Sequence, residues 1–252
     1  MRVIAALATG AAALLSLAGA GLQPQAPSST VVEADRLHAE ADDPASALAA
    51  LRQEVRLLDQ AVAQGGGRYE LLWRAARASG ELGTRRDGSG RREAFEHAIE
   101  LGRRAVAARP DRVEGHYWLA AAYGRDAEAR GGLKGFLLAR RLRGEMETVV
   151  RLQPDYQGGD AFLALGELDR ALPGWLGGDR ARGRRTLEAG LRVAPGNAEL
   201  KLELARAYLD EHRTADARRL LEALAVPAAP AGVDEAVARQ ARELLASTAS
   251  RP

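Results

Sequence analysis

A helix that ends just before a proline, followed by a second helix that opens just beyond it, recurs along this chain and restricts its fold more than any other feature. In the clearest copy, Val106 lies near the end of one helix, Pro110 follows, and Trp118 lies in the next helix. Weaker copies end at Pro154 and Pro195. Because proline cannot continue a helix, this repetition indicates helix pairs stacked into a solenoid.

Composition also favours helices and excludes several kinds of function. Aromatic residues are only 4% of the chain, while alanine, leucine, arginine and glutamate dominate. The 36 Lys+Arg nearly balance the 34 Asp+Glu, which predicts no basic surface for nucleic acid. Since the chain has no cysteine, disulfides, thiolate metal sites and a cysteine-borne lipid anchor are excluded.

The first residues have the features of an export signal. Arg2 gives a positive start, residues 3–17 are apolar, and residues 18–20 form a small-x-small site. We predict a signal peptide at residues 1–20, cleaved after Ala20, and a periplasmic or secreted protein. The alternative is an uncleaved N-terminal membrane anchor, because the apolar run extends to Leu22 and approaches the roughly 20 residues that span a bilayer.

The next segments are predicted from helix signals. Residues 21–42 are interpreted as a flexible leader with a weak first helix, which either pairs with the next helix or stays disordered. Asp43 is expected to cap a helix that has Pro44 in its first turn and runs to about residue 64. Asp111 is expected to cap the helix that carries Trp118.

The helix pairs have a recognisable residue pattern. Leu-Ala followed by Tyr occurs at Leu119-Ala120 with Tyr123 and at Leu204-Ala205 with Tyr208, and spaced small residues, Ala98 and Ala105, precede Pro110. This pattern resembles the tetratricopeptide repeat, which pairs two helices within about 34 residues. The resemblance implies an all-α, tetratricopeptide-like helical-hairpin solenoid of about four repeats. The repeat domain is predicted over residues 43–226, followed over residues 227–252 by a linker, a capping helix and a tail.

Two intervals are longer than this repeat. Pro110 and Pro154 are 44 positions apart, and Pro154 and Pro195 are 41 apart. We place the surplus in long inter-helix loop insertions at residues 129–136 and 172–179. Such insertions often carry the binding function of a solenoid.

The insertions extend the resemblance. The matching residues are Trp118-Leu119-Ala120, Tyr123-Gly124-Arg125, Gly131-Gly132-Leu133-Lys134-Gly135 and Leu172-Pro173-Gly174-Trp175-Leu176-Gly177-Gly178-Asp179. Over about residues 69–224 the chain resembles the T component, the periplasmic helical protein associated with tripartite (TRAP-type) transporters. The resemblance implies an accessory role in periplasmic solute uptake, with a solute-binding protein as partner. This chain departs from it by lacking the lipid-anchor cysteine.

A partner-binding surface is predicted on the concave face, which the first helix of each pair lines in this repeat class. Aromatic and arginine residues are enriched at binding hot spots, and arginine favours a carboxylate-bearing partner or ligand. The alternative is that the aromatic residues pack between helices and the arginines form a solvated face. The residues projected onto this face are Trp73, Arg77, Tyr117, Arg125, Glu167, Arg170 and Arg206.

The insertions add two candidates. Residues 172–179 lack the Gly-Lys-Ser/Thr of a phosphate-binding loop. We expect Pro173-Gly174 to form a turn, Trp175 to pack into the helical core and Asp179 to cap the next helix, with ligand contact by Trp175 as the alternative. Lys134 is either a partner contact or a solubilising charge.

Catalysis and metal binding have no support in the sequence. His38, His97, His116 and His212 lack metal-ligand spacing and are interpreted as packing residues. We find no nucleophile motif and no pair of inward carboxylates, so no catalytic residue, no metal and no cofactor is predicted.

These observations predict an exported, non-enzymatic helical-repeat scaffold that docks a partner protein or an anionic ligand on its concave face. It would be an accessory component of a periplasmic solute-uptake system. The alternative is a generic tetratricopeptide adaptor in envelope assembly or secretion, with no link to a transporter. No nucleic acid and no stable membrane insertion of the cleaved chain are expected, and self-association is left open.

Overall fold

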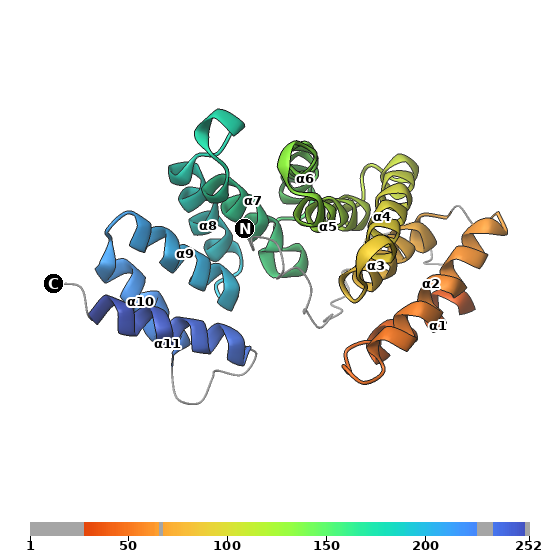
Figure 1. Cartoon of the computed structure of the whole chain (residues 1–252), viewed down its shortest axis with the longest axis horizontal. Coiled ribbons are helices and arrows are strands. Elements are labelled where there is room, and N and C mark those ends of the chain that lie inside the picture. Colours follow the sequence, from red (N-terminus) through yellow and green to blue (C-terminus); the bar gives the residue numbers. More distant parts are fainter. Residues whose placement is uncertain (1–27, 66–67, 226–233, 250–252) are drawn as a thin grey trace, which may run out of the picture. The chain divides into compact units, whose positions relative to one another are not determined.

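The computed structural model describes residues 28–65, 68–225 and 234–249, and every regular element in these ranges is helical (Figure 1). This confirms the all-α fold. The elements, in chain order, are α1 (Ser29–Glu40), α2 (Ala47–Ala63), α3 (Tyr69–Thr84), α4 (Gly88–Ala108), α5 (Val113–Arg130), α6 (Gly132–Leu152), the 3₁₀ turn η1 (Tyr156–Gly159), α7 (Asp160–Ala171), the 3₁₀ turn η2 (Gly174–Leu176), α8 (Arg180–Val193), α9 (Ala198–Asp210), α10 (Thr214–Leu224) and α11 (Glu235–Ala249).

The described residues form two compact units, which divide between Glu145 and Met146 within α6. In the N-terminal unit, α1 packs on α2, α2 packs on α3, and α3 packs on α4 and α5. The weak first helix of the sequence therefore forms, and it pairs with α2.

Glycine sets how closely the helices of the N-terminal unit approach. A Cβ atom on Gly83 of α3 would lie 2.5 Å from Phe95 Cε1 of α4, and one on Gly102 of α4 would lie 3.0 Å from Leu119 Cβ of α5. Side chains at these positions would force the helices apart, which explains why small residues recur in the pattern.

Beyond the end of α6, the C-terminal unit contains the pairs α7/α8 and α9/α10, followed by α11. Leu187 of α8 and Leu200 of α9 belong to one buried cluster. A second cluster joins Leu221 of α10 to Val237 and Ala241 of α11. Helix α11 thus covers the apolar side of the last repeat, which confirms the predicted capping helix.

Two predicted helix caps are wrong. Helix α2 begins at Ala47 with Ser46 at its N-cap, whereas the Asp43 carboxylate accepts a hydrogen bond from the Ala45 amide at 3.1 Å. Asp43 therefore forms a turn on its own local backbone, as short polar side chains do, and the helix starts after it. Asp111 binds the Arg109 guanidinium at 2.9 and 3.0 Å and does not cap α5.

One predicted insertion is a loop and the other is not. Residues 129–136 are helical except at Gly131, whose φ of 60° ends α5 before α6 begins. The surplus residues there lengthen two helices. Residues 172–179 do form a loop, and the Asp179 carboxylate accepts a hydrogen bond from the Arg182 amide at 2.9 Å, capping α8 as predicted.

The predicted signal peptide, most of the leader and most of the linker before the capping helix lie outside the described residues. Within the described ranges, no helix combines the length and the apolar character needed to cross a bilayer.

Candidate partner-binding site

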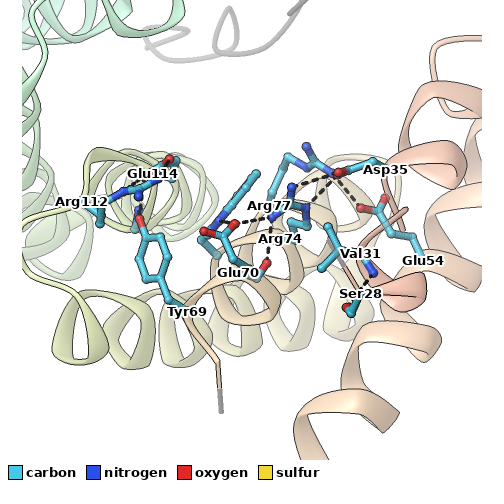
Figure 2. Close-up of polar contacts among 12 residues, drawn as sticks. Ser28, Val31, Asp35, Glu54, Tyr69, Glu70, Arg74, Arg77, Arg112 and Glu114 are labelled. Atoms are coloured by element: carbon cyan, nitrogen blue, oxygen red, sulfur yellow. Dashed lines mark hydrogen bonds and ion pairs between the residues drawn. The ribbon is translucent and has the colours of Figure 1, made fainter. Parts of the chain in front are cut away.

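A connected polar surface of the N-terminal unit is formed by Asp35 of α1 with Glu70, Arg74 and Arg77 of α3 (Figure 2). We call this surface, together with Trp73 of α3, the α1–α3 face. The four α3 residues are spaced by three and four positions, so they share one side of the helix. Packing of α1 against α3 brings Asp35 to the same side.

Arg74 connects the two helices. Its Nε and Nη2 donate to the two Asp35 carboxylate oxygens at 2.8 and 2.9 Å, and its Nη1 donates to Glu70 Oε2 at 2.7 Å. Burial raises the pKa of Asp35, but the hydrogen bonds and charge of Arg74, together with Arg77, outweigh that effect and hold it below its ordinary value. Such bidentate pairing fixes both orientation and register.

Below this pair lies a buried ion pair. Arg77 Nη2 donates to Glu54 Oε1 at 3.0 Å, and the Glu54 side chain is fully buried. His38 Nδ1 lies 3.3 Å from the other Glu54 oxygen, so that carboxylate joins α1, α2 and α3. A charge in this position persists only because it is paired.

Trp73 lies against both arginines. The Arg74 and Arg77 guanidinium carbons are 4.1 and 5.4 Å from its ring centroid, and its Nε1 donates to Glu70 Oε2 at 3.0 Å. The indole is 9% exposed, whereas the Asp35 and Glu70 side chains are 44% and 49% exposed. The accessible polar groups of the face are therefore carboxylates, and its arginines are already paired.

Hydrogen bonds also join the start of α3 to the start of α5. The Tyr69 hydroxyl donates to Glu114 Oε2 at 2.8 Å and accepts from the Gly115 amide at 2.9 Å (Figure 2). Tyr117 is 1% exposed and contacts Trp118 edge to face. Burial lowers the pKa of Arg125, and a Cβ atom on Gly80 of α3 would lie 2.9 Å from its Nη1.

In the C-terminal unit the predicted residues gather around Glu203. Arg170 Nη1 donates to Glu203 Oε2 at 2.8 Å, and Arg206 Nη1 donates to Glu203 Oε1. Burial, then the charges of Glu203 and Glu199, raise the pKa of Glu167 to about 9. Burial also raises the pKa of Glu199 to about 7, with Asp160 contributing most among the charges.

The structure therefore groups most of the predicted residues into two sets. Trp73, Arg77, Tyr117 and Arg125 lie on α3 and α5 of the N-terminal unit, and Glu167, Arg170 and Arg206 lie on α7 and α9 of the C-terminal unit. Their role in binding stays a prediction. Tyr117 is too buried to offer a direct contact surface in this conformation.

The two remaining candidates lie outside both sets. Trp175 is 84% exposed on η2, so the expectation that it packs into the core is wrong. The Pro173 carbonyl accepts hydrogen bonds from the Leu176 and Gly178 amides, which closes a tight turn and leaves the indole outside it. Lys134 is exposed at the start of α6.

Sequence reasoning missed Asp35, Glu54, Glu70, Arg74 and Glu203. Spacing on α3 could have indicated Glu70 and Arg74, because both lie one turn from residues already selected. No sequence signal pairs Asp35 with Arg74, since these residues are 39 positions apart.

Two of the histidines each lie against one carboxylate. His116 Nδ1 lies 2.6 Å from Glu145 Oε2, and His97 Nε2 lies 2.8 Å from Asp59 Oδ1. Among the described residues, no group of three or more histidine or acidic side chains could hold a metal ion.

The fold and the polar faces of the first helices define a tetratricopeptide-type repeat protein. A tetratricopeptide-repeat model matches residues 176–239. The chain belongs to the family described as Regulator of microtubule dynamics protein 1-3, whose model matches residues 30–163, more than half of its length.

A solved structure supports the fold. The chain is similar to the crystal structure of TTC0263, a thermophilic tetratricopeptide-repeat protein of Thermus thermophilus, with a TM-score of 0.57 and 19% identity over 87% of this chain and 97% of the other. No curated protein matches the sequence.

Proposed function

We propose that the protein is a non-enzymatic scaffold whose α1–α3 face binds a protein partner through a basic segment. The observation that carries this proposal is the arrangement around Trp73, where two paired arginines flank the indole and the accessible groups are Asp35 and Glu70. Exposed carboxylates beside an aromatic ring are complementary to lysine or arginine side chains.

A small anionic ligand fits this face less well. Arg74 and Arg77 already donate to Asp35, Glu54 and Glu70, so an added anion would compete with three internal carboxylates. A peptide segment can instead bind along the face and pair with the exposed acids while the internal ion pairs stay intact.

Photo-crosslinking tests the proposal on the full chain. A photo-reactive residue at Val32, which is exposed on α1 one turn before Asp35, is expected to give a discrete protein adduct in extract of the source cells, and Trp73→Ala should remove it. The same residue at Glu100, which is exposed on α4, serves as the matched control. Identical adducts from both positions would refute binding at this face.

The name of the family refers to regulators of microtubule dynamics. For this chain, the family name supports only the proposal that the partner is a protein. The export signal predicted at residues 1–20 supports a periplasmic or secreted location, and N-terminal sequencing of the mature protein tests it by asking whether the chain begins at Gly21.

A second candidate function is an accessory role in periplasmic solute uptake. It is supported by the resemblance of residues 172–179 to the transporter T component and by the exposed Trp175 within them, a residue type enriched at hot spots. Co-purification with a periplasmic solute-binding protein, reduced by Trp175→Ala, would support it. Recovery of envelope-assembly or secretion proteins instead would favour the generic adaptor.

A further inference from the structure

A groove of about 550 Å³ lies among α2, α3 and α4, and it uses none of the residues of the α1–α3 face. Its volume falls in the range of small-molecule sites, roughly 300–1,000 Å³. All of its lining residues belong to the N-terminal unit.

Three arginines line this groove. Arg52 and Arg56 come from successive turns of α2, and Arg86 comes from the connection between α3 and α4. Glu93 is the one carboxylate among the lining residues of the groove, so positive charge is in excess there. His97 also lines it, with its Nε2 held by Asp59 at 2.8 Å.

These arginines differ from those of the α1–α3 face. Among the described residues, no carboxylate forms an ion pair with Arg52, Arg56 or Arg86, whereas Arg74 and Arg77 are both paired. Guanidinium groups bind carboxylate and phosphate oxygens in a bidentate manner, so three unpaired ones at one groove favour an anionic group.

The lining of the groove also includes an apolar part. Val55, Leu82 and Ala94 lie between the charged residues, and Leu82 and Ala94 are buried. A ligand for this groove therefore carries an apolar portion as well as its charge, because contact with these side chains removes apolar surface from water.

A buried polar atom points to the same groove. Ser79, which is 1% exposed, lines it, and its hydroxyl oxygen has no hydrogen-bond partner among the residues that the structure describes. Serine within a helix commonly bonds the carbonyl one turn back, and a buried hydroxyl without a partner is uncommon in folded proteins. A polar ligand atom at this position would satisfy it.

We propose that the groove is a binding site for a small amphiphilic anion. The anionic headgroup would lie among Arg52, Arg56 and Arg86, and the apolar body would contact Val55, Leu82 and Ala94. This site is independent of the partner-binding proposal, because the two use different residues of α3.

Calorimetric titration of the full chain tests the site. Decanoate is expected to bind with a dissociation constant of roughly 100 μM or tighter, and decyl phosphate in a parallel arm distinguishes a carboxylate from a phosphate headgroup. Decanol tests the need for charge and acetate tests the need for the apolar portion. Both should bind at least tenfold more weakly.

Substitutions then locate the binding. Arg52→Gln, Arg56→Gln and Arg86→Gln should each weaken decanoate binding about tenfold, and circular dichroism confirms that each variant is folded. Arg218→Gln removes the same charge from an exposed position on α10 and should leave binding unchanged. Absence of binding by both decanoate and decyl phosphate, equal binding of decanol, or wild-type affinity in the three arginine variants would each overturn the proposal.

Discussion

At the scale of single residues, Arg77 and Glu54 form the interaction whose removal has the clearest consequence. The Glu54 carboxylate is fully buried and accepts a hydrogen bond from Arg77 at 3.0 Å. Arg77→Met would leave that carboxylate without its cationic partner, which costs about 3 kcal/mol of unfolding free energy.

The pairing itself is measured by a double-mutant cycle. Glu54→Leu with Arg77→Met removes both charges and should be less destabilised than the sum of the two single variants. Urea unfolding followed by circular dichroism gives the three values. Additive losses would show that the two side chains contribute separately.

Glu167 predicts how stability depends on pH. Burial and the neighbouring Glu203 and Glu199 raise its pKa to about 9 in the folded protein. Above its unfolded pKa of about 4.5, the unfolded chain releases the proton while the folded chain keeps it, so this residue lowers stability as pH rises toward 9.

Glu167→Gln should therefore stabilise the protein on the order of 2 kcal/mol at pH 8 and leave it unchanged near pH 4. The measurement compares thermal unfolding of the variant and the wild type across this range. A variant curve parallel to that of the wild type would mean that Glu167 is already ionised in the folded state.

At the scale of helices, the distance between a glycine and the neighbouring helix shows whether a larger residue can replace that glycine. A Cβ atom on Gly166 of α7 would lie 2.5 Å from Leu187 Cγ of α8, whereas one on Gly144 of α6 would meet nothing within 4 Å. Alanine is the better helix former by about 1 kcal/mol, so the two substitutions have opposite expected signs.

Gly166→Ala should destabilise the chain by about 2 kcal/mol, because overpacking outweighs the gain in helix propensity. Gly144→Ala should stabilise it by about 0.5 kcal/mol. Urea midpoints of the two variants provide the comparison, and stabilisation by both would indicate that α8 moves aside without cost.

Helices were easier to predict from the sequence than their ends and their partners. Periodicity and proline positions indicated the pairs, and the Leu-Ala and Tyr pattern indicated the repeat class, because both depend on residues close in sequence. The long interval between Pro110 and Pro154 predicts a loop insertion at residues 129–136, yet Gly131 alone separates α5 from α6, and the surplus residues lengthen these helices.

The charge pattern of the candidate site could not be predicted for a different reason. The sequence pattern places Arg77 on the first-helix side as a candidate binding residue, but Arg77 binds Glu54 of α2, so it is not a free cation. Such pairing is decided by tertiary contacts between separate helices. The unpaired arginines of the groove among α2, α3 and α4 can therefore be identified only from the structure, once these ion pairs are known.

At the scale of the whole molecule, the described residues form two compact units, and the boundary between them falls within α6. In a repeat protein each element is stabilised mainly by its neighbours, so a local change spreads over a limited distance. A defect in one unit should therefore loosen that unit first.

Hydrogen exchange monitored by mass spectrometry tests this expectation with Gly166→Ala, whose added Cβ atom disturbs contacts only within the C-terminal unit. Exchange should become faster in peptides from α7, α8 and α9, while peptides from α2, α3 and α4 keep the wild-type rate, because local opening depends on local contacts. The same measurement on the double variant Glu54→Leu, Arg77→Met should show faster exchange in the N-terminal unit. If both changes accelerate exchange equally along the whole chain, the two units unfold as one, and α6 transmits the loss of packing from either side.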